Sequence, residues 1–175
     1  FYLFLTCMML LAEIAREEKL FAWLAAQTIN YAGGSSPKLF LLIYIVGIIV
    51  TAFLSNDATA VVLTPAVAAA VRSAKVKKPL PFLMICAFIA NAASFVLPIS
   101  NPANLVIYGS HMPPLLEWLS TYFLSSLLAI ILTYILMYWR LRKDIHQKVE
   151  ARIQIPPLSR EAGIAGIAII ATAIL

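Results

Sequence analysis

The sequence predicts an all-α integral membrane protein built from transmembrane helices, a re-entrant hairpin and a broken helix. Three observations predict this fold class. Hydrophobic residues make up 62% of the chain and charged residues only 12%, which is the composition of a membrane protein. Two apolar stretches, 39–71 and 82–109, are interrupted by polar or proline residues. Basic residues gather just beyond the apolar segments, where they orient loops toward the cytoplasm.

Residues 1–175 are expected to form a single membrane domain, a fragment of a longer protein, since both ends of the sequence lie in apolar segments. A membrane-spanning helix needs about 20 predominantly apolar residues. Residues 82–109 and 115–139 are each long enough to cross, although the first of these spans is broken. Residues 1–12 fit the end of another span, and residues 162–175 fit the start of one.

Residues 39–71 form a stretch that is too long for one ordinary span and too short for two spans with a loop. Basic residues follow this stretch and also fill the segment 140–161, so both loops should be cytoplasmic. The two spans between these loops already cross once in each direction. The stretch therefore has to enter and leave on the same side, as a re-entrant hairpin with legs 39–54 and 58–71 and the tripeptide SND, 55–57, at its tip.

Residues 13–31 carry too many charges to span a membrane. Apolar residues recur among these charges at helical spacing, so we expect an amphipathic helix that lies in the cytoplasmic interface. An ordinary soluble helical loop is the alternative.

Several classes of function find no support in the sequence. The net charge of +5 would suit a nucleic-acid partner, but the basic residues flank hydrophobic segments, so we expect no such partner. Cys7 and Cys86 lie far apart and outside any cysteine or histidine motif, so neither a disulfide framework nor a metal site is expected. No phosphate-binding or hydrolase motif occurs. We therefore expect a protein without a cofactor that is not an enzyme.

The second interruption falls at Pro98 and Pro102, each of which removes a helix hydrogen bond. Freed carbonyl groups, with nearby Ser and Asn side chains, can coordinate a cation or bind a polar solute. Inverted-repeat secondary transporters place their sites where discontinuous helices meet, so we expect one such repeat. The candidate substrate- and ion-binding residues are Ser55, Asn56, Asp57, Thr59, Ser100, Asn101 and Asn104. The alternative is a pair of kinks whose polar side chains only satisfy the backbone.

Asp57 is the single charged residue that these assignments place inside the membrane. A carboxylate there is costly and marks a functional site by default. A low dielectric favours its neutral form unless a cation is bound, which is the requirement for proton coupling. Asp also favours the N-cap position, so capping of the second half-helix is a compatible alternative.

Three segments together resemble the arsenite permease (arsenical pump membrane protein) family of the ion transporter superfamily. They are FLSNDATAVVLTP at 53–65, FIANAASFVLPISNPANLVIYG at 88–109 and the basic WRLRKDI at 139–145. The resemblance runs from about residue 10 to about residue 145 and covers the N-terminal half of such a protein. It implies that the serine-asparagine turn at the hairpin tip and the broken helix together hold ion and substrate.

The resemblance implies secondary active efflux of arsenite, and of antimonite, across the cytoplasmic (inner) membrane of a prokaryote. H⁺ is the expected coupling ion and Na⁺ the alternative. A separate arsenite-stimulated ATPase subunit and a homodimer in the lipid bilayer are compatible with it. Uncharged arsenite suits Asn, Ser and Thr partners, whereas an anion carrier is expected to use basic groups, and the predicted intramembrane segments hold no Lys or Arg.

Other functions stay open at this point. Within the superfamily, the alternatives are a sodium/proton antiporter and a sodium-coupled dicarboxylate or sulfate carrier. Outside it, the alternative is a membrane scaffold or receptor that transports nothing and whose helix breaks are structural. Substrate-dependent flux would separate the last of these from any carrier.

Overall fold

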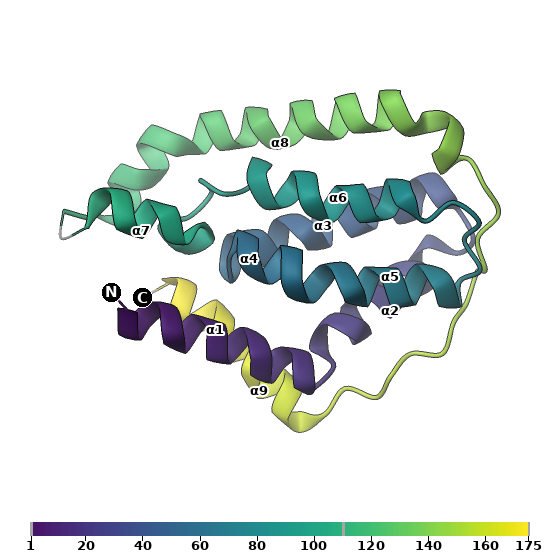
Figure 1. The fold of residues 1–175 in the computed structure, drawn as a ribbon, viewed down its shortest axis with the longest axis horizontal. Helices are drawn as coiled ribbons and strands as arrows, with labels where there is room; N and C mark the ends of the chain where they lie inside the picture. The colour runs from purple at the N-terminus through teal and green to yellow at the C-terminus, as the bar shows by residue number, and fades with distance from the viewer. Residues whose placement is uncertain (1, 110, 175) are drawn as a thin grey trace.

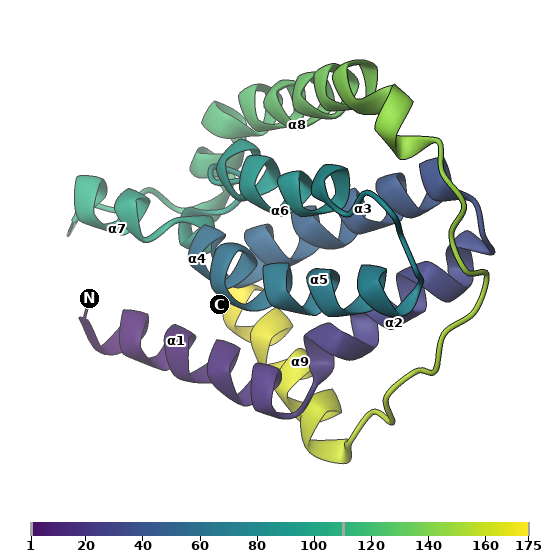
Figure 2. The same cartoon turned by 45° about the vertical axis from the view of Figure 1, so that its right-hand side comes forward.

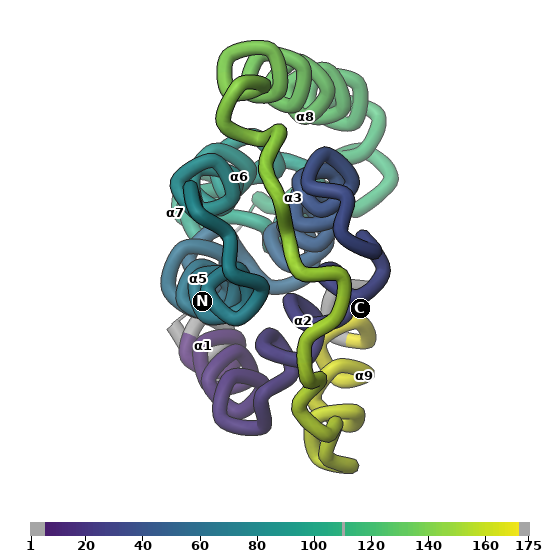
Figure 3. The backbone as a smooth tube through the Cα atoms, turned by 90° about the vertical axis from the view of Figure 1, so that its right-hand side faces the viewer, coloured from purple at the N-terminus to yellow at the C-terminus, as the bar shows by residue number. Residues whose placement is uncertain are grey.

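The computed structural model describes residues 2–109 and 111–174, and helices without any β-strand make up the secondary structure of these residues. Residues 1, 110 and 175 lie outside the described residues. The sequence predicts the end of a span at residue 1, a turn at residue 110 and the start of a span at residue 175. The helices pack in layers (Figure 1). α8 (Leu115–Ile145) covers one face, and α1 (Tyr2–Glu17) and α9 (Arg160–Ile174) cover the opposite face. The end-on view shows the same order (Figure 3).

Two helices of the described part of the chain are long and apolar enough to cross a membrane, namely α3 (Ser36–Phe53) and α8. α6 (Leu80–Ala92) is apolar but shorter. Half of the apolar window of α3 is buried by other helices, whereas only 6% of that of α8 is buried. An exposed apolar helix face of this length suits contact with lipid or with another protein segment. The predicted all-α class is thus confirmed.

The chain reverses direction at Leu54 and Ser55, where the sequence predicts the hairpin tip. α3 leads into the reversal. The return leg is a continuous helical run of α4 (Asn56–Ala58), the π-helical turn η1 (Thr59–Leu63) and α5 (Thr64–Ser73) (Figures 1 and 2). The position of this hairpin within a membrane stays a prediction.

Both legs extend beyond the predicted ranges 39–54 and 58–71. α3 begins earlier because the Ser35 side chain accepts a hydrogen bond from the Lys38 backbone N–H and because Pro37 occupies the first turn, a position that favours helix initiation. The return leg begins directly after Ser55, which is its N-cap.

α2 (Leu20–Ala32) packs against both legs of the hairpin, and α6 packs against both as well. The buried side chains of α2 include Phe21, Ala25 and Ile29. The structure therefore divides the predicted interfacial helix 13–31. Its first five residues continue α1, and the chain bends at Lys19, which has a left-handed φ of 61°. The interfacial position of the segment remains a prediction.

α3 and α6 approach each other closely at Gly47. A Cβ atom added at Gly47 of α3 would lie 2.6 Å from Cγ2 of Ile89 in α6, and Ile89 is fully buried. Glycine therefore permits an approach that any side chain would prevent.

The predicted broken span 82–109 is interrupted in the structure. α6 ends at Ala92, a 3₁₀ turn follows at Pro98–Ser100 (η2), and α7 covers Pro102–Tyr108. The prolines account for the later part of the interruption, since each lacks an N–H and clashes with a preceding carbonyl group.

α8 continues through Ile145 and thereby extends beyond the predicted span 115–139. The added residues include Arg140, Leu141, Arg142 and Lys143, which are good helix formers. The cytoplasmic loop predicted for 140–161 is shortened accordingly.

The loop 146–159 is bound to the ends of other helices. Gln147 pairs with the backbone of Lys78 in both directions, because its Nε2 donates to the Lys78 carbonyl at 2.9 Å and its Oε1 accepts from the Lys78 N–H at 2.8 Å. Asn30 pairs with the backbone of Ile153 in the same way, at 3.1 and 2.8 Å. The loop thus joins α2 and the α5–α6 turn to the end of α8.

Candidate functional site

The hairpin tip is shaped by short polar side chains that cap the return leg. The Ser55 hydroxyl accepts a hydrogen bond from the Ala58 N–H at 3.1 Å, and the Asn56 side-chain oxygen accepts one from the Asp57 N–H at 2.9 Å. These bonds satisfy N–H groups that a helix start leaves without partners. The predicted capping role therefore belongs to Ser55, and the Asp57 side chain is left for other contacts.

The π-helical turn follows from the sequence around Pro65. Proline cannot donate a backbone hydrogen bond, and its ring excludes the carbonyl group four residues earlier, so the helix widens by one residue. The Thr59 carbonyl accepts hydrogen bonds from the Thr64 N–H and, at 3.1 Å, from the Thr64 hydroxyl. Such single π turns are frequent at functional sites.

Thr59 itself joins the two legs of the hairpin. Its hydroxyl lies 2.8 Å from that of Thr51 in α3, and both side chains are fully buried. The sequence predicts that Thr59 binds substrate. In the structure its hydroxyl group instead contacts Thr51 inside the hairpin.

The broken helix is fastened to the hairpin by Ser100. Its hydroxyl donates to the carbonyl of Ala52 in the last turn of α3, at 3.0 Å, and accepts from the Leu97 N–H at 3.0 Å. Asn101 caps α7, as its side-chain oxygen accepts from the Ala103 N–H at 2.9 Å.

Asn104 holds the interruption closed from within. Its Nδ2 donates to the carbonyl groups of Ser94 and Pro98, at 3.0 and 3.3 Å. The side chain is buried, and its Oδ1 has no hydrogen-bond partner among residues 2–109 and 111–174. An unpaired buried oxygen is costly and offers a ligand to a water molecule or a cation.

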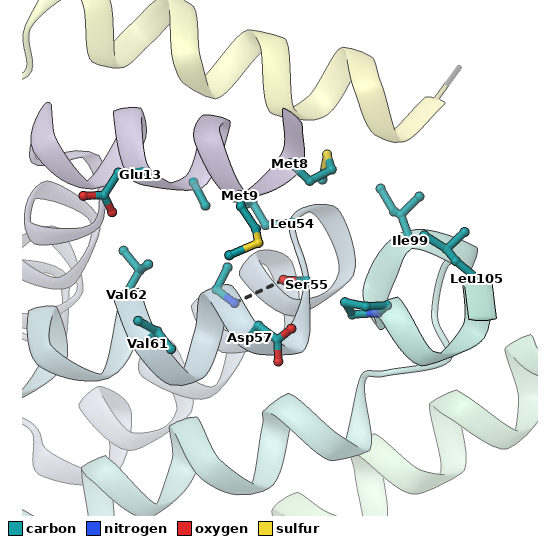
Figure 4. Close-up of a pocket in the computed structure, with 13 residues that line it drawn as sticks. Met8, Met9, Glu13, Leu54, Ser55, Asp57, Val61, Val62, Ile99 and Leu105 are labelled. Atoms are coloured by element: carbon teal, nitrogen blue, oxygen red, sulfur yellow. Dashed lines mark hydrogen bonds between the residues drawn. The ribbon is translucent and has the colours of Figure 1, made fainter. Parts of the chain in front are cut away.

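A cavity of about 260 Å³ lies where α1, the hairpin tip and the broken helix meet (Figure 4). Its lining is mostly apolar. The lining residues are Met8, Met9, Ala12, Glu13, Leu54, Ser55, Asp57, Ala58, Val61, Val62, Ile99, Pro102 and Leu105. The carboxylate of Asp57 receives no hydrogen bond within the described part of the chain.

The structure brings together only part of the predicted site. Ser55 and Asp57 line the cavity, and the broken helix contributes the neighbouring Ile99 and Pro102. The remaining predicted residues, Asn56, Thr59, Ser100, Asn101 and Asn104, do not line it. The two interruptions therefore both contribute to one cavity, but most of their polar side chains hold the backbone in place, and the predicted binding role of these residues stays a prediction.

α1 supplies one wall of the cavity that the sequence did not indicate. Met8, Met9 and Glu13 of α1 line the cavity, and Glu13 lies at the end near Val62, away from Ser55 and Asp57 (Figure 4). Glu13 is bound by Arg16, whose Nε donates to Oε2 at 2.8 Å and whose Nη2 donates to Oε1. The sequence shows that Glu13 lies three residues before Arg16, but nothing in the sequence linked α1 to residues 55–57.

No group of three or more His, Cys, Asp or Glu side chains in the described ranges is placed to hold a metal ion. The cavity instead offers a hydroxyl, two carboxylates and apolar walls. These groups suit a small solute with hydroxyl groups or a monovalent cation.

The family model described as "Citrate transporter" matches residues 2–175. The chain belongs to the citrate transporter family. This family membership confirms the prediction of a membrane transporter.

Curated relatives of this citrate transporter family member include an arsenical pump membrane protein of Escherichia coli, 32% identical over 143 residues, which are 80% of this chain and 33% of the relative. An arsenical pump membrane protein of Yersinia enterocolitica is 31% identical over 131 residues, 74% of this chain and 30% of the relative. A "Putative transporter arsB" of Dictyostelium discoideum is 30% identical over 142 residues, 81% of this chain and 25% of the relative. The resemblance to arsenite permeases is thus confirmed.

The chain spans about a third of the length of the arsenical pump membrane proteins that it matches. No match was found among solved structures.

Proposed function

We propose that the complete protein carrying this chain exports arsenite and antimonite across the cytoplasmic (inner) membrane of a bacterium in exchange for protons. The observation that carries the proposal is the Asp57 carboxylate, which lies beside Ser55 at a helix reversal, in a cavity that the broken helix also lines. Secondary transporters rely on discontinuous helices that meet at a shared site. The names of the relatives from Escherichia coli and Yersinia enterocolitica support the substrate.

We also propose that the hairpin is re-entrant from the cytoplasm and belongs to one of two inverted repeats. The basic turn 74–79 after α5 and the loop 146–159 after α8 lie at the same end of the molecule (Figure 1). The C-terminal end of α7 and the start of α8 lie at the other end (Figure 1). Lys and Arg near the ends of apolar helices mark the cytoplasmic side, which supports this orientation.

The charge of the cavity favours an uncharged substrate over citrate. Glu13 and Asp57 line the cavity, whereas no Lys or Arg residue is part of its described lining. A citrate or dicarboxylate anion would meet repulsion from both side chains and would find no basic partner in the described lining. Arsenite is mostly uncharged at neutral pH and presents three hydroxyl groups, which can donate to a carboxylate and accept from Ser55. The same reasoning disfavours a sulfate carrier.

Sodium/proton antiport is the second candidate function. The Asn104 Oδ1 atom, which is buried and without a partner in the described ranges, is the kind of oxygen ligand that Na⁺ accepts. This observation does not require a metalloid substrate.

The test is arsenite uptake into everted vesicles that contain the complete protein, with a proton gradient, with a sodium gradient, with ATP, or with none of these. Uptake that depends on the proton gradient is expected. Sodium-dependent proton movement without arsenite uptake would establish the antiporter. Uptake driven by ATP when the proton gradient is dissipated would indicate a separate ATPase subunit.

Asp57→Asn examines the coupling directly, because it removes the ionisable group while the shape of the side chain is kept. We expect the protein to insert normally and arsenite uptake to lose its dependence on the pH gradient. Glu117→Gln, at an exposed carboxylate in the first turn of α8, is the control and should behave as the wild type. Normal coupling in Asp57→Asn would refute the proton-carrier role.

A further inference from the structure

Glu13 is a second carboxylate in the cavity and comes from a different element than Asp57. It lies at the end of the cavity away from Ile99 and Leu105, and Met9 and Val61 lie between it and the broken helix (Figure 4). α1 runs from Met8 toward Glu13 in the direction of the basic loops, as does the return leg of the hairpin (Figure 1). Glu13 therefore lies at the end of the cavity that is nearer to those loops.

The charge of Glu13 is fixed by its neighbour on the same helix. Arg16 binds both carboxylate oxygens through two of its nitrogen atoms, a bidentate geometry that is stronger than a single hydrogen bond. These hydrogen bonds hold the pKa of the Glu13 carboxyl below its ordinary value. Arg16 itself does not line the cavity. Of this ion pair, Glu13 is therefore the member that contributes to the lining.

Few other charges lie on the elements that pack against α1. α2 and the π-helical turn contain no charged residue. α9 carries Arg160 and Glu161 in its first turn. On α1 itself, Glu13 and Arg16 form the ion pair, and Glu17 also acts electrostatically on Arg16. At the hairpin tip, the charged residue that lines the cavity is Asp57.

We propose that Glu13 determines specificity by excluding anions, so that the cavity admits uncharged oxyacids of the arsenite and antimonite type and rejects carboxylate and oxyanion solutes. The role rests on the proposed export function. A charge at the mouth of a low-dielectric cavity acts more strongly than the same charge in water, although its exposure and the neighbouring Arg16 weaken it. The Glu13 side chain is 49% exposed, so we expect its replacement to change the selectivity for solutes and not the stability of the fold.

The test measures how strongly citrate inhibits arsenite uptake into everted vesicles and compares this inhibition between variants. Citrate is an anion and is added on the side that corresponds to the cytoplasm. In Glu13→Gln we expect citrate to inhibit about three- to tenfold more strongly, measured as the citrate inhibition constant divided by the arsenite KM. Glu13→Asp keeps the charge and should retain the wild-type ratio. Glu17→Gln removes an exposed carboxylate one turn further along α1, outside the cavity lining, and should leave the ratio unchanged.

Citrate binding to the purified complete protein, followed by calorimetry, is the second readout and does not depend on arsenite transport. We expect tighter binding to Glu13→Gln than to the wild type. Glu13→Ala, which also removes the charge, replaces Glu13→Gln if the latter does not fold.

The outcomes separate the two proposals. Absence of arsenite uptake by the wild type would refute the export function, while a gain of citrate binding in Glu13→Gln would still support the role of Glu13. An unchanged ratio and unchanged citrate binding in Glu13→Gln would overturn that role, as would an equal change in Glu17→Gln. Transport of citrate by the wild type would overturn both.

Discussion

Replacing Gly47 by alanine tests whether the contact between α3 and α6 holds the hairpin in position. The new Cβ atom would lie 2.6 Å from Ile89 Cγ2, about 1 Å closer than an ordinary contact between carbon atoms. Ile89 is fully buried and, as a β-branched residue, has little rotameric freedom with which to move aside. α3 must therefore shift away from α6, and the shift would reach Ser55 at the tip.

The expected cost lies in the upper part of the range for overpacking, about 1–3 kcal/mol. A loss of about 2 kcal/mol lowers the ratio of folded to unfolded protein roughly thirtyfold. The assay is denaturant unfolding of the complete protein in detergent, alongside arsenite uptake. Gly163→Ala is the matched control, because nothing lies within 4 Å of its added Cβ and because alanine favours a helix by about 0.5–1 kcal/mol over glycine.

The two alanine substitutions should thus change stability in opposite directions. Unfolding of Gly47→Ala at the same denaturant concentration as Gly163→Ala would refute the reasoning. A double-mutant cycle with Ile89→Ala, which removes the contacted methyl group, gives a second check. We expect the double variant to be at least about 1 kcal/mol more stable than the sum of the single effects, since residues in contact are not additive. Additive costs would show that the contact does not exist.

Three further predictions concern the broken helix, the topology and the effect of pH. Ser100→Ala should lower the free energy of unfolding by about 1–3 kcal/mol, because the Ala52 carbonyl and the Leu97 N–H lose their partner. The control Ser73→Ala, at an exposed serine, should change the free energy of unfolding by less than about 0.5 kcal/mol. Equal unfolding of the two variants would contradict the role of Ser100. In a background without native cysteines, Ser73→Cys should react with an impermeant maleimide only from the cytoplasm and His111→Cys only from outside, whereas labelling of both from one side would exclude the re-entrant hairpin. Since Arg16 holds the pKa of Glu13 below its ordinary value, Arg16→Gln should let Glu13 lose its charge at a higher pH than in the wild type; as the pH falls, citrate inhibition of arsenite uptake should therefore begin to strengthen at a higher pH in Arg16→Gln than in the wild type, and identical pH profiles of the two proteins would contradict this role of Arg16.

The hairpin tip and the later part of the second interruption could be predicted from the sequence because their causes are local, whereas the end of α6 at Ala92, ahead of Pro98, was not predicted. Pro98 and Pro102 break a helix wherever they occur in its interior, and consecutive Ser, Asn and Asp residues favour an N-cap over a helix interior. The membrane composition and the all-helical class follow from residue counts. The reversal at Leu54 was also predictable, since basic residues flank an apolar stretch of unsuitable length.

The lining of the cavity could not be predicted because it depends on contacts between distant segments. Ser100 turned out to satisfy a carbonyl at the end of α3, and Thr59 pairs with Thr51 across the hairpin. A sequence shows which side chains are polar, but it does not show which backbone groups are left without partners near them. Glu13 was missed for the same reason, since only the packing of α1 against the return leg of the hairpin places it in the cavity lining.

The paired amides of the loop 146–159 bear on how the protein can be engineered. Gln147 and Asn30 fix the loop as far as Ile153, whereas Pro157 and Leu158 beyond it are exposed. A fluorescent protein or an affinity tag inserted after Pro157 should be tolerated, because no paired segment has to open. The same insertion after Lys148 would fall between two contacts with the turn 74–79, the pairing of Gln147 with Lys78 and the hydrogen bond from the Glu150 N–H to the Ala74 carbonyl.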